Sequence, residues 1–169
     1  LPPCSPVGAR AFPRPPPAPS PLALQPPTMY EFIDTLSRID PLTGLHNRRE
    51  FDRMLAQELQ RAQQTGRQLS LIVADIDHFK QINDRFGHQE GDRALQQVAR
   101  LIQMVPKRVT DAGFRTGGEE FAILMTDTDK NGALTLSESL RSLTESARFF
   151  GPNQPVTVSL GVASFPADG

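Results

Sequence analysis

Two short acidic segments are the parts of this 169-residue chain best suited to chemistry. Asp75-Ile76-Asp77 directly follows an apolar run, and Glu119-Glu120 directly follows two adjacent glycines. Carboxylates gathered at one place repel each other unless a cation lies among them. Oxygen ligands without a set of histidines and cysteines are typical of Mg²⁺ or Mn²⁺ sites. The two segments therefore predict a metal site if the fold brings them together. Alternatively, they are solvated strand ends or pair with Lys80 and Arg115.

A second group of polar side chains, Asn83, His88 and Asp92, follows the first acidic segment. An amide and a carboxylate can together bond to the Watson–Crick edge of guanine. Gly87 and Gly91 would let the backbone turn sharply between these side chains. The alternative is that Asp92 caps the following helix and that His88 is an ordinary loop histidine.

Residues 127–138 match the calcium-binding loop of EF-hands, D-x-D-x-N-G-x₅-E, at every fixed position. An EF-hand needs a helix before this loop, whereas residues 121–125 have the pattern of a strand. We therefore expect a polar turn between a strand and a helix, with Asp129 or Asn131 as the helix cap. A calcium-regulated interaction module is the less favoured alternative.

Composition separates a tail from a folded domain. Eleven of the 16 prolines fall within residues 1–27, which predicts a disordered or polyproline-like tail or linker. This tail holds two of the 18 basic side chains and none of the 19 acidic ones, so the rest is net acidic. A net-acidic domain is a poor candidate for binding a nucleic-acid polymer. Cys4 is the only cysteine, which favours a reducing, cytoplasmic location, and no apolar run is long enough for a membrane segment.

Hydrophobic periodicity predicts alternating helices and strands. Residues 69–74 form a near-continuous apolar run, as in a strand covered on both faces. Gly117 and Gly118 between two strands predict a hairpin with a tight turn that needs positive φ. The expected helices are 28–39, 48 to about 65 with Asn47 as cap, a helix following Gly91-Asp92 and ending at Pro106, and 131–149. The expected strands are 69–74, 113–116, 119–125 and 156–164. This order implies a layered α/β or α+β sheet.

Four motifs, in order along the chain, resemble those of GGDEF domains, the diguanylate cyclases. They are Asp40-Pro41-Leu42-Thr43-Gly44-Leu45-His46-Asn47-Arg48-Arg49, the block 75–92, Gly117-Gly118-Glu119-Glu120-Phe121 in its GGEEF variant, and Val158-Ser159-Leu160-Gly161-Val162-Ala163. The resemblance covers residues 40–169. It implies a central, mostly antiparallel sheet flanked by helices, with the GG turn in a β-hairpin. Residues 28–39 would then be a linker or stalk helix.

The resemblance also implies an activity: bacterial second-messenger synthesis, in which two GTP molecules are joined into cyclic di-GMP with loss of two pyrophosphates. Each domain would bind one GTP, so the active form would be a homodimer. The implied catalytic residues are Glu119 and Glu120, and the implied ligands of Mg²⁺ or Mn²⁺ are Asp75, the Ile76 carbonyl, Glu119 and Glu120. The implied substrate-binding residues are Asn83, His88, Asp92, Phe79, Lys80, Gly117 and Gly118.

Arg108 and Asp111 form an R-x-x-D pattern ending five residues before the GG turn. The resemblance places the family's inhibitory product site there, where an arginine could stack on guanine and a carboxylate could accept from its edge. The family pattern continues past Val162 into a final helix that this sequence, ending at Gly169, does not contain. A catalytically weak domain that binds cyclic di-GMP or GTP is therefore the alternative to an active cyclase.

Overall fold

The structure is a computed structural model that describes residues 38–105, 108, 110–147, 149–150 and 155–169. The Pro-rich tail, 1–27, and the expected stalk helix up to residue 37 lie outside the described residues. Ile39, at the end of that expected helix, forms an isolated antiparallel bridge with His46. The expected helix therefore does not include Ile39.

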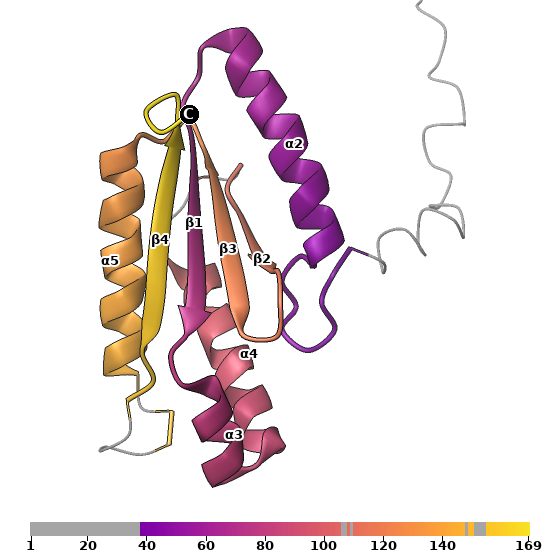
Figure 1. Ribbon diagram of the computed structural model, residues 1–169, viewed down its shortest axis with the longest axis vertical. Helices are drawn as coiled ribbons and strands as arrows, with labels where there is room; N and C mark the ends of the chain where they lie inside the picture. The colour runs from indigo at the N-terminus through magenta and orange to yellow at the C-terminus, as the bar shows by residue number, and fades with distance from the viewer. Residues whose placement is uncertain (1–37, 106–107, 109, 148, 151–154) are drawn as a thin grey trace, which may run out of the picture.

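Four antiparallel strands form one sheet in the order β2-β3-β1-β4 (Figure 1). The strands are β1 (Leu69–Ile76), β2 (Ala112–Arg115), β3 (Glu120–Thr126) and β4 (Val158–Phe165). The described helices are α2 (Arg48–Thr65), α3 (Phe79–Phe86), α4 (His88–Met104) and α5 (Lys130–Ser146). An antiparallel sheet flanked by helices is an α+β fold, which confirms the expected fold class.

The central strand β1 buries its two faces unequally. Ile72, Ala74 and Ile76 are at most 2% exposed and belong to the core shared with α4 and α5. On the opposite face Leu69 is buried in the cluster that also contains Phe51 of α2, whereas Val73 is 44% exposed. The expectation of a strand covered on both sides is therefore wrong at Val73.

Helix α2 starts and stops where its sequence predicts. The side chain of Asn47 accepts a hydrogen bond from the Glu50 backbone N–H at 3.1 Å, and Gly66 ends the helix with a left-handed φ of 68°. Phe51 of α2 meets Phe114 of β2 edge-on, with ring centroids 5.4 Å apart. The helix therefore packs against β2, the first strand of the GG hairpin.

Helix α3 is an element that the sequence patterns did not predict. It has eight residues, Phe79–Phe86, and Gly87 with φ of 86° separates it from α4. Helix α4 therefore begins at His88, before Gly91 and Asp92, with Gly87 as its N-cap residue. The interpretation of Asp92 as the helix cap is wrong, because Asp92 lies inside the first turns of α4.

Candidate functional site

The two acidic segments meet at the carboxyl end of β1. In the sheet register Asp75 stands opposite Glu120, and the Ile76 N–H donates to the Glu119 carbonyl at 3.3 Å. Antiparallel pairing brings the segments together because the end of β1 faces the start of β3. The predicted meeting of these carboxylates is thus a property of the sheet register.

The surroundings of Asp75 disfavour its charge. Burial raises the pKa of the Asp75 carboxyl above its usual value, and the charges of Glu120 and Asp77 raise it further. The residue is nevertheless exposed, so solvent reaches its carboxyl group. Repulsion among accessible carboxylates is the condition that a bound cation relieves.

The oxygen donors at this site fit a cation that also keeps water or phosphate oxygens as ligands. Within the described residues, no three His, Cys, Asp or Glu side chains converge as a complete metal cage. Mg²⁺ is commonly held by one or two carboxylates while water and substrate phosphates supply the remaining oxygens. Asp75, Glu119 and Glu120, with the Ile76 carbonyl, are suitable donors for such an incomplete set.

Asp77 has a different role from Asp75. Its carboxylate accepts hydrogen bonds from Ser159 at 2.6 Å and from Thr157 at 2.7 Å. The bond from Ser159, followed by that from Thr157, lowers the pKa of Asp77 despite the opposing effect of burial. Asp77 therefore joins β1 to the start of β4, and two of its acceptor positions are already used. Sequence reasoning did not find Thr157 and Ser159, since the strand pairing alone brings them to Asp77.

The GG turn is a loop of four residues, 116–119, between β2 and β3. The N–H groups of Thr116 and Gly117 both donate to the Glu120 carbonyl, at 2.9 and 3.3 Å. Neither glycine of the turn has a positive φ, so the expected tight primed turn is wrong. A Cβ on Gly117 would lie 2.3 Å from a carboxylate oxygen of Glu120 and 3.2 Å from the Glu120 Cβ, so the Glu120 side chain would have to shift. A Cβ on Gly118 would meet nothing in the free protein.

Asn83 of α3 lies against α4 at Gly91. A Cβ on Gly91 would come within 1.9 Å of the Asn83 side-chain oxygen. Gly91 therefore makes room for Asn83 rather than turning the chain, while Gly87 makes the turn. His88 and Asp92, one helical turn apart at the start of α4, are both exposed. The structure thus places Asn83 beside the α4 turn that carries His88 and Asp92.

Phe79 and Lys80 open α3, directly after the carboxyl end of β1. Phe79 is 9% exposed and belongs to the core, while Lys80 is exposed. The first N–H groups of a helix have no partners within the helix and favour anions. This end of α3 therefore presents backbone N–H donors and the positive charge of Lys80 just after the end of β1, where the acidic segments meet.

Arg108 and Asp111 lie at the other end of β3. The Asp111 carboxylate accepts from the Arg108 N–H at 2.8 Å and from the Thr126 N–H at 3.2 Å. The Arg108 guanidinium donates to the Asp127 carbonyl at 2.5 Å. The two residues line a hollow of about 590 Å³ beside α5, together with Leu136 and Ser139.

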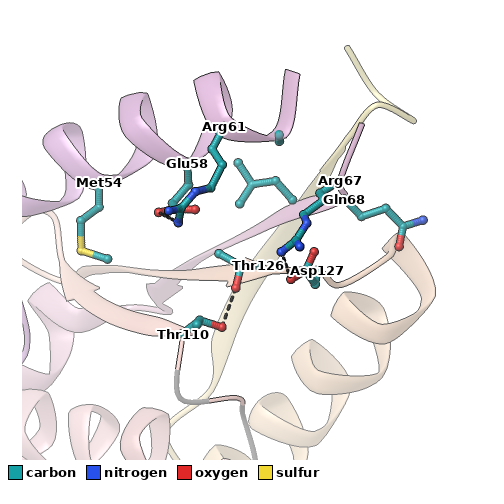
Figure 2. Close-up of a pocket in the computed structure, with 10 residues that line it drawn as sticks. Met54, Glu58, Arg61, Arg67, Gln68, Thr110, Thr126 and Asp127 are labelled. Carbon is teal, nitrogen blue, oxygen red and sulfur yellow. Dashed lines mark hydrogen bonds and ion pairs between the residues drawn. The ribbon is translucent and has the colours of Figure 1, made fainter. Parts of the chain in front are cut away.

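A second hollow, of about 290 Å³, lies beside this segment, between the end of α2 and the sheet (Figure 2). Arg67 pairs there with Asp127 at 3.2 Å, and the Thr110 and Thr126 hydroxyls are 2.6 Å apart. Arg61 of α2 also lines the hollow. The R-x-x-D segment therefore lies between two hollows that contain basic side chains.

The EF-hand pattern is not a calcium loop in this fold. Asp129 caps α5, accepting from the Gly132 N–H at 2.8 Å, and the helix begins at Lys130. Glu138, the last position of the pattern, lies within α5 and bonds to Arg141. The expected turn with a capping Asp129 is confirmed.

The alternative in which Arg115 pairs with the acidic segments is wrong, because its guanidinium makes other contacts. Its guanidinium pairs with Asp40 at 3.2 Å and donates to the Gly118 carbonyl at 2.8 Å. Asp40 is 75 residues away in the chain, so no local pattern connects it with Arg115. The sequence signal for this role of Arg115 is its position two residues before Gly117.

Comparison with known proteins agrees with this geometry. A family model described as the diguanylate cyclase GGDEF domain matches residues 37–169. The diguanylate cyclase DgcP of Pseudomonas aeruginosa is 42% identical over 130 residues, which are 75% of this chain and 19% of that protein. The chain spans less than two fifths of the length of the curated relatives it matches.

Solved structures show the same fold. The GGDEF domain of DgcB from Caulobacter crescentus, in complex with c-di-GMP, matches with a TM-score of 0.70 and 35% identity, covering 76% of this chain and 77% of that one. The active GGEEF domain of a diguanylate cyclase from Vibrio cholerae matches with a TM-score of 0.68 and 37% identity, covering 72% and 77%. The chain therefore belongs to the GGDEF-domain family of diguanylate cyclases.

Proposed function

We propose that residues 40–169 form a catalytic domain that condenses two GTP molecules into cyclic di-GMP and two pyrophosphates. The observation that carries this proposal is the register pair of Asp75 and Glu120, two carboxylates held together beside the GG turn. The family membership of the chain and its likeness to an active GGEEF domain support the same activity.

The reaction consists of two equivalent substitutions at phosphorus. The 3′-oxygen of each GTP forms a bond to the α-phosphorus of the other, and the bond from that phosphorus to the bridging oxygen of the β-phosphate breaks. Pyrophosphate leaves with that electron pair. Glu119, assisted by Glu120, accepts the proton of the attacking hydroxyl. Both residues lie where the loop 116–119 enters β3, next to the end of β1.

Asp75, the Ile76 carbonyl, Glu119 and Glu120 would hold Mg²⁺ or Mn²⁺ beside the triphosphate. When bound, such an ion neutralises phosphate charge and favours the ionised hydroxyl. The raised pKa of Asp75 supports this assignment, because a cation would relieve the repulsion that causes part of the shift. Lys80 and the Phe79 N–H would bind phosphate oxygens at the start of α3.

Asn83 and Asp92 would bind the guanine edge, with His88 near the nucleoside. The support is the packing of Asn83 against Gly91, which holds the amide next to the α4 turn bearing the other two residues. Gly117 and Gly118 would let the chain pass close to the nucleotide, where a side chain would obstruct it.

One domain supplies one nucleotide site, so turnover requires two domains face to face in a homodimer. We also propose that cyclic di-GMP inhibits at Arg108 and Asp111. The guanidinium of Arg108 has donors beyond its bond to the Asp127 carbonyl, and both residues line the hollow beside α5.

We place the reaction in the cytoplasm, where GTP is available. None of the helices in the described part of the chain has the length and apolarity of a membrane span. Several staphylococcal relatives are named as membrane proteins.

The test is pyrophosphate release from GTP with Mg²⁺, with the product identified by mass. The parent chain, Glu119→Ala and Glu120→Ala are compared, with Arg141→Ala on α5 as the control. We expect cyclic di-GMP from the parent and the control, and at least a hundredfold less from the two glutamate variants, as for loss of a general base. The rate per domain should rise with protein concentration, because two domains must meet.

Guanine nucleotide binding without any product would overturn the catalytic proposal. It would favour a domain that only binds GTP or cyclic di-GMP.

A further inference from the structure

We infer that Arg115 is a positioning residue that sets the direction of the Glu119 side chain and couples it to the Asp40 turn. This inference rests on the proposed function, since it assigns a role toward the proposed base. Arg115 is the last residue of β2 and its side chain is 16% exposed. Its guanidinium forms hydrogen bonds to two segments that lie far apart in the chain.

The first of these segments is the turn 40–45. Asp40 accepts from the N–H and hydroxyl of Thr43 at 2.9 and 2.6 Å, and from Arg115 at 3.2 and 3.3 Å. The Asp40 N–H also donates to the Leu45 carbonyl, and the Asp40 carbonyl accepts from the Gly44 N–H. The Asp40 side chain is only 18% exposed. Arg115 is therefore anchored on a rigid turn.

The second segment is the GG turn. The Nη2 and Nε atoms of Arg115 donate to the Gly118 carbonyl at 2.8 and 3.3 Å. The Gly118 residue is exposed, and a Cβ there would contact nothing, so packing does not hold this part of the turn. The hydrogen bonds from the guanidinium therefore fix the direction of the Gly118 carbonyl, which no side-chain packing at the glycine holds.

The peptide planes on both sides of Glu119 are consequently fixed. Arg115 holds the Gly118 carbonyl, and the Ile76 N–H holds the Glu119 carbonyl at 3.3 Å. Because a trans peptide is planar, fixing these two carbonyls fixes φ and ψ of Glu119 and hence the direction of its Cα–Cβ bond. Arg115 therefore aims Glu119 without touching the substrate.

A lysine cannot replace this arrangement. The planar guanidinium presents several donors in a rigid fork, so it bonds to a carboxylate on one side and a carbonyl on the other. A lysine ammonium is a compact charge that can keep the attraction to Asp40 but not both sets of bonds. Arg115→Lys thus separates the ion pair from the alignment of the turn.

The experiment measures turnover, melting temperature and amide hydrogen exchange for the parent, Arg115→Lys and the control Arg141→Lys. We expect Arg115→Lys to lower kcat by about tenfold or more, because a small misplacement of a catalytic group is costly. KM for GTP should change less than kcat, since the side chains proposed to bind guanine and phosphate do not contact Arg115. The melting temperature should stay close to that of the parent.

Amide exchange separates this inference from the proposed function. The Ile76 N–H should exchange faster in Arg115→Lys, whereas the Asp77 N–H, which donates to the Thr157 carbonyl at 3.0 Å, should not change. If the parent makes no product, the proposed function fails and the Ile76 exchange rate alone decides the positioning role. Unchanged Ile76 exchange, or an active parent matched by Arg115→Lys in kcat, would overturn the inference.

Discussion

Asp75 lies near the end of β1 and Asp77 lies directly after that strand, yet their surroundings shift their pKa values in opposite directions. Burial and the charges of Glu120 and Asp77 raise the pKa of Asp75. Hydrogen bonds from Ser159 and Thr157 lower the pKa of Asp77. The charge of Asp75 is repelled by its neighbours, which suits a bound cation. Asp77 instead stabilises the contact between the end of β1 and the start of β4.

Asp75→Asn should therefore stabilise the protein without metal at pH 7 and remove its response to Mg²⁺. A raised pKa means that ionisation of Asp75 costs stability, and this cost is present once the pH exceeds the folded pKa. The parent should gain melting temperature on addition of Mg²⁺ and GTP. Thermal unfolding with and without the metal checks this. An equal Mg²⁺ response in Asp75→Asn would contradict the role of Asp75 as a ligand.

Gly91→Ala should weaken GTP binding while leaving stability nearly unchanged. The new Cβ would lie 1.9 Å from the Asn83 oxygen, which can move because it ends a flexible side chain, and 3.3 Å from the Phe79 ring, which must shift by a few tenths of an ångström. The helix propensity gained, up to about 1 kcal/mol, offsets the new crowding. Calorimetric titration of GTP should show roughly tenfold weaker binding, as for one lost pair of hydrogen bonds.

The matched comparison is Asn83→Ala, alone and together with Gly91→Ala. The double variant should bind GTP no more weakly than Asn83→Ala, because both changes remove the same amide. Additive losses would show that Gly91 acts on the nucleotide by another route.

At the scale of the elements, short polar signals mark where two of the described helices begin. Asn47 and Asp129 each accept an N–H bond at the start of their helices, α2 and α5. The helix that was missed, α3, has eight residues and no side-chain cap, and His78 before it has a left-handed φ of 58°. Its apolar stripe is too short to indicate a helix by periodicity, and packing of Phe79 in the core stabilises it.

Asn47→Ala should lower the free energy of unfolding by about 1 kcal/mol, because it removes the acceptor for the Glu50 N–H. Asn47→Asp, which keeps an acceptor, should lose much less. Chemical denaturation of both variants measures the difference. Equal losses would show that the cap bond does not carry the effect, and that other contacts of Asn47 do.

At the scale of the whole molecule, two acids connect segments that are distant in the chain. Asp77 links β1 to β4, and Asp40 links the first turn to the GG hairpin through Arg115. Burial tends to raise the pKa of Asp40, but hydrogen bonds from Thr43 and Arg115 lower it overall. Hydrogen bonds from Ser159 and Thr157 likewise lower the pKa of Asp77. Both long-range connections therefore depend on ionised carboxylates.

Stability should accordingly fall in acid. A carboxyl group with a lowered pKa stabilises the fold above its unfolded pKa, here 3.8, and loses that contribution as the pH falls through the folded value. Unfolding measured from pH 7 down to pH 2 should show the loss below about pH 4. Asp77→Asn should be less stable than the parent at pH 7 and approach it in acid. A constant difference across this range would contradict the titration of Asp77.

The sequence by itself determined the family, the strands, the ends of α2 and the acids that meet at the GG turn, because these depend on local patterns and on motif order. Only the tertiary structure decided that Gly91 makes room for Asn83, that Asp77 is bonded to β4, and that Arg115 joins Asp40 to Gly118. Those contacts lie between residues as much as 82 positions apart, or depend on the space around a single side chain. Periodicity describes which face of an element is apolar, whereas the register of the sheet and the packing of its helices decide which polar groups meet.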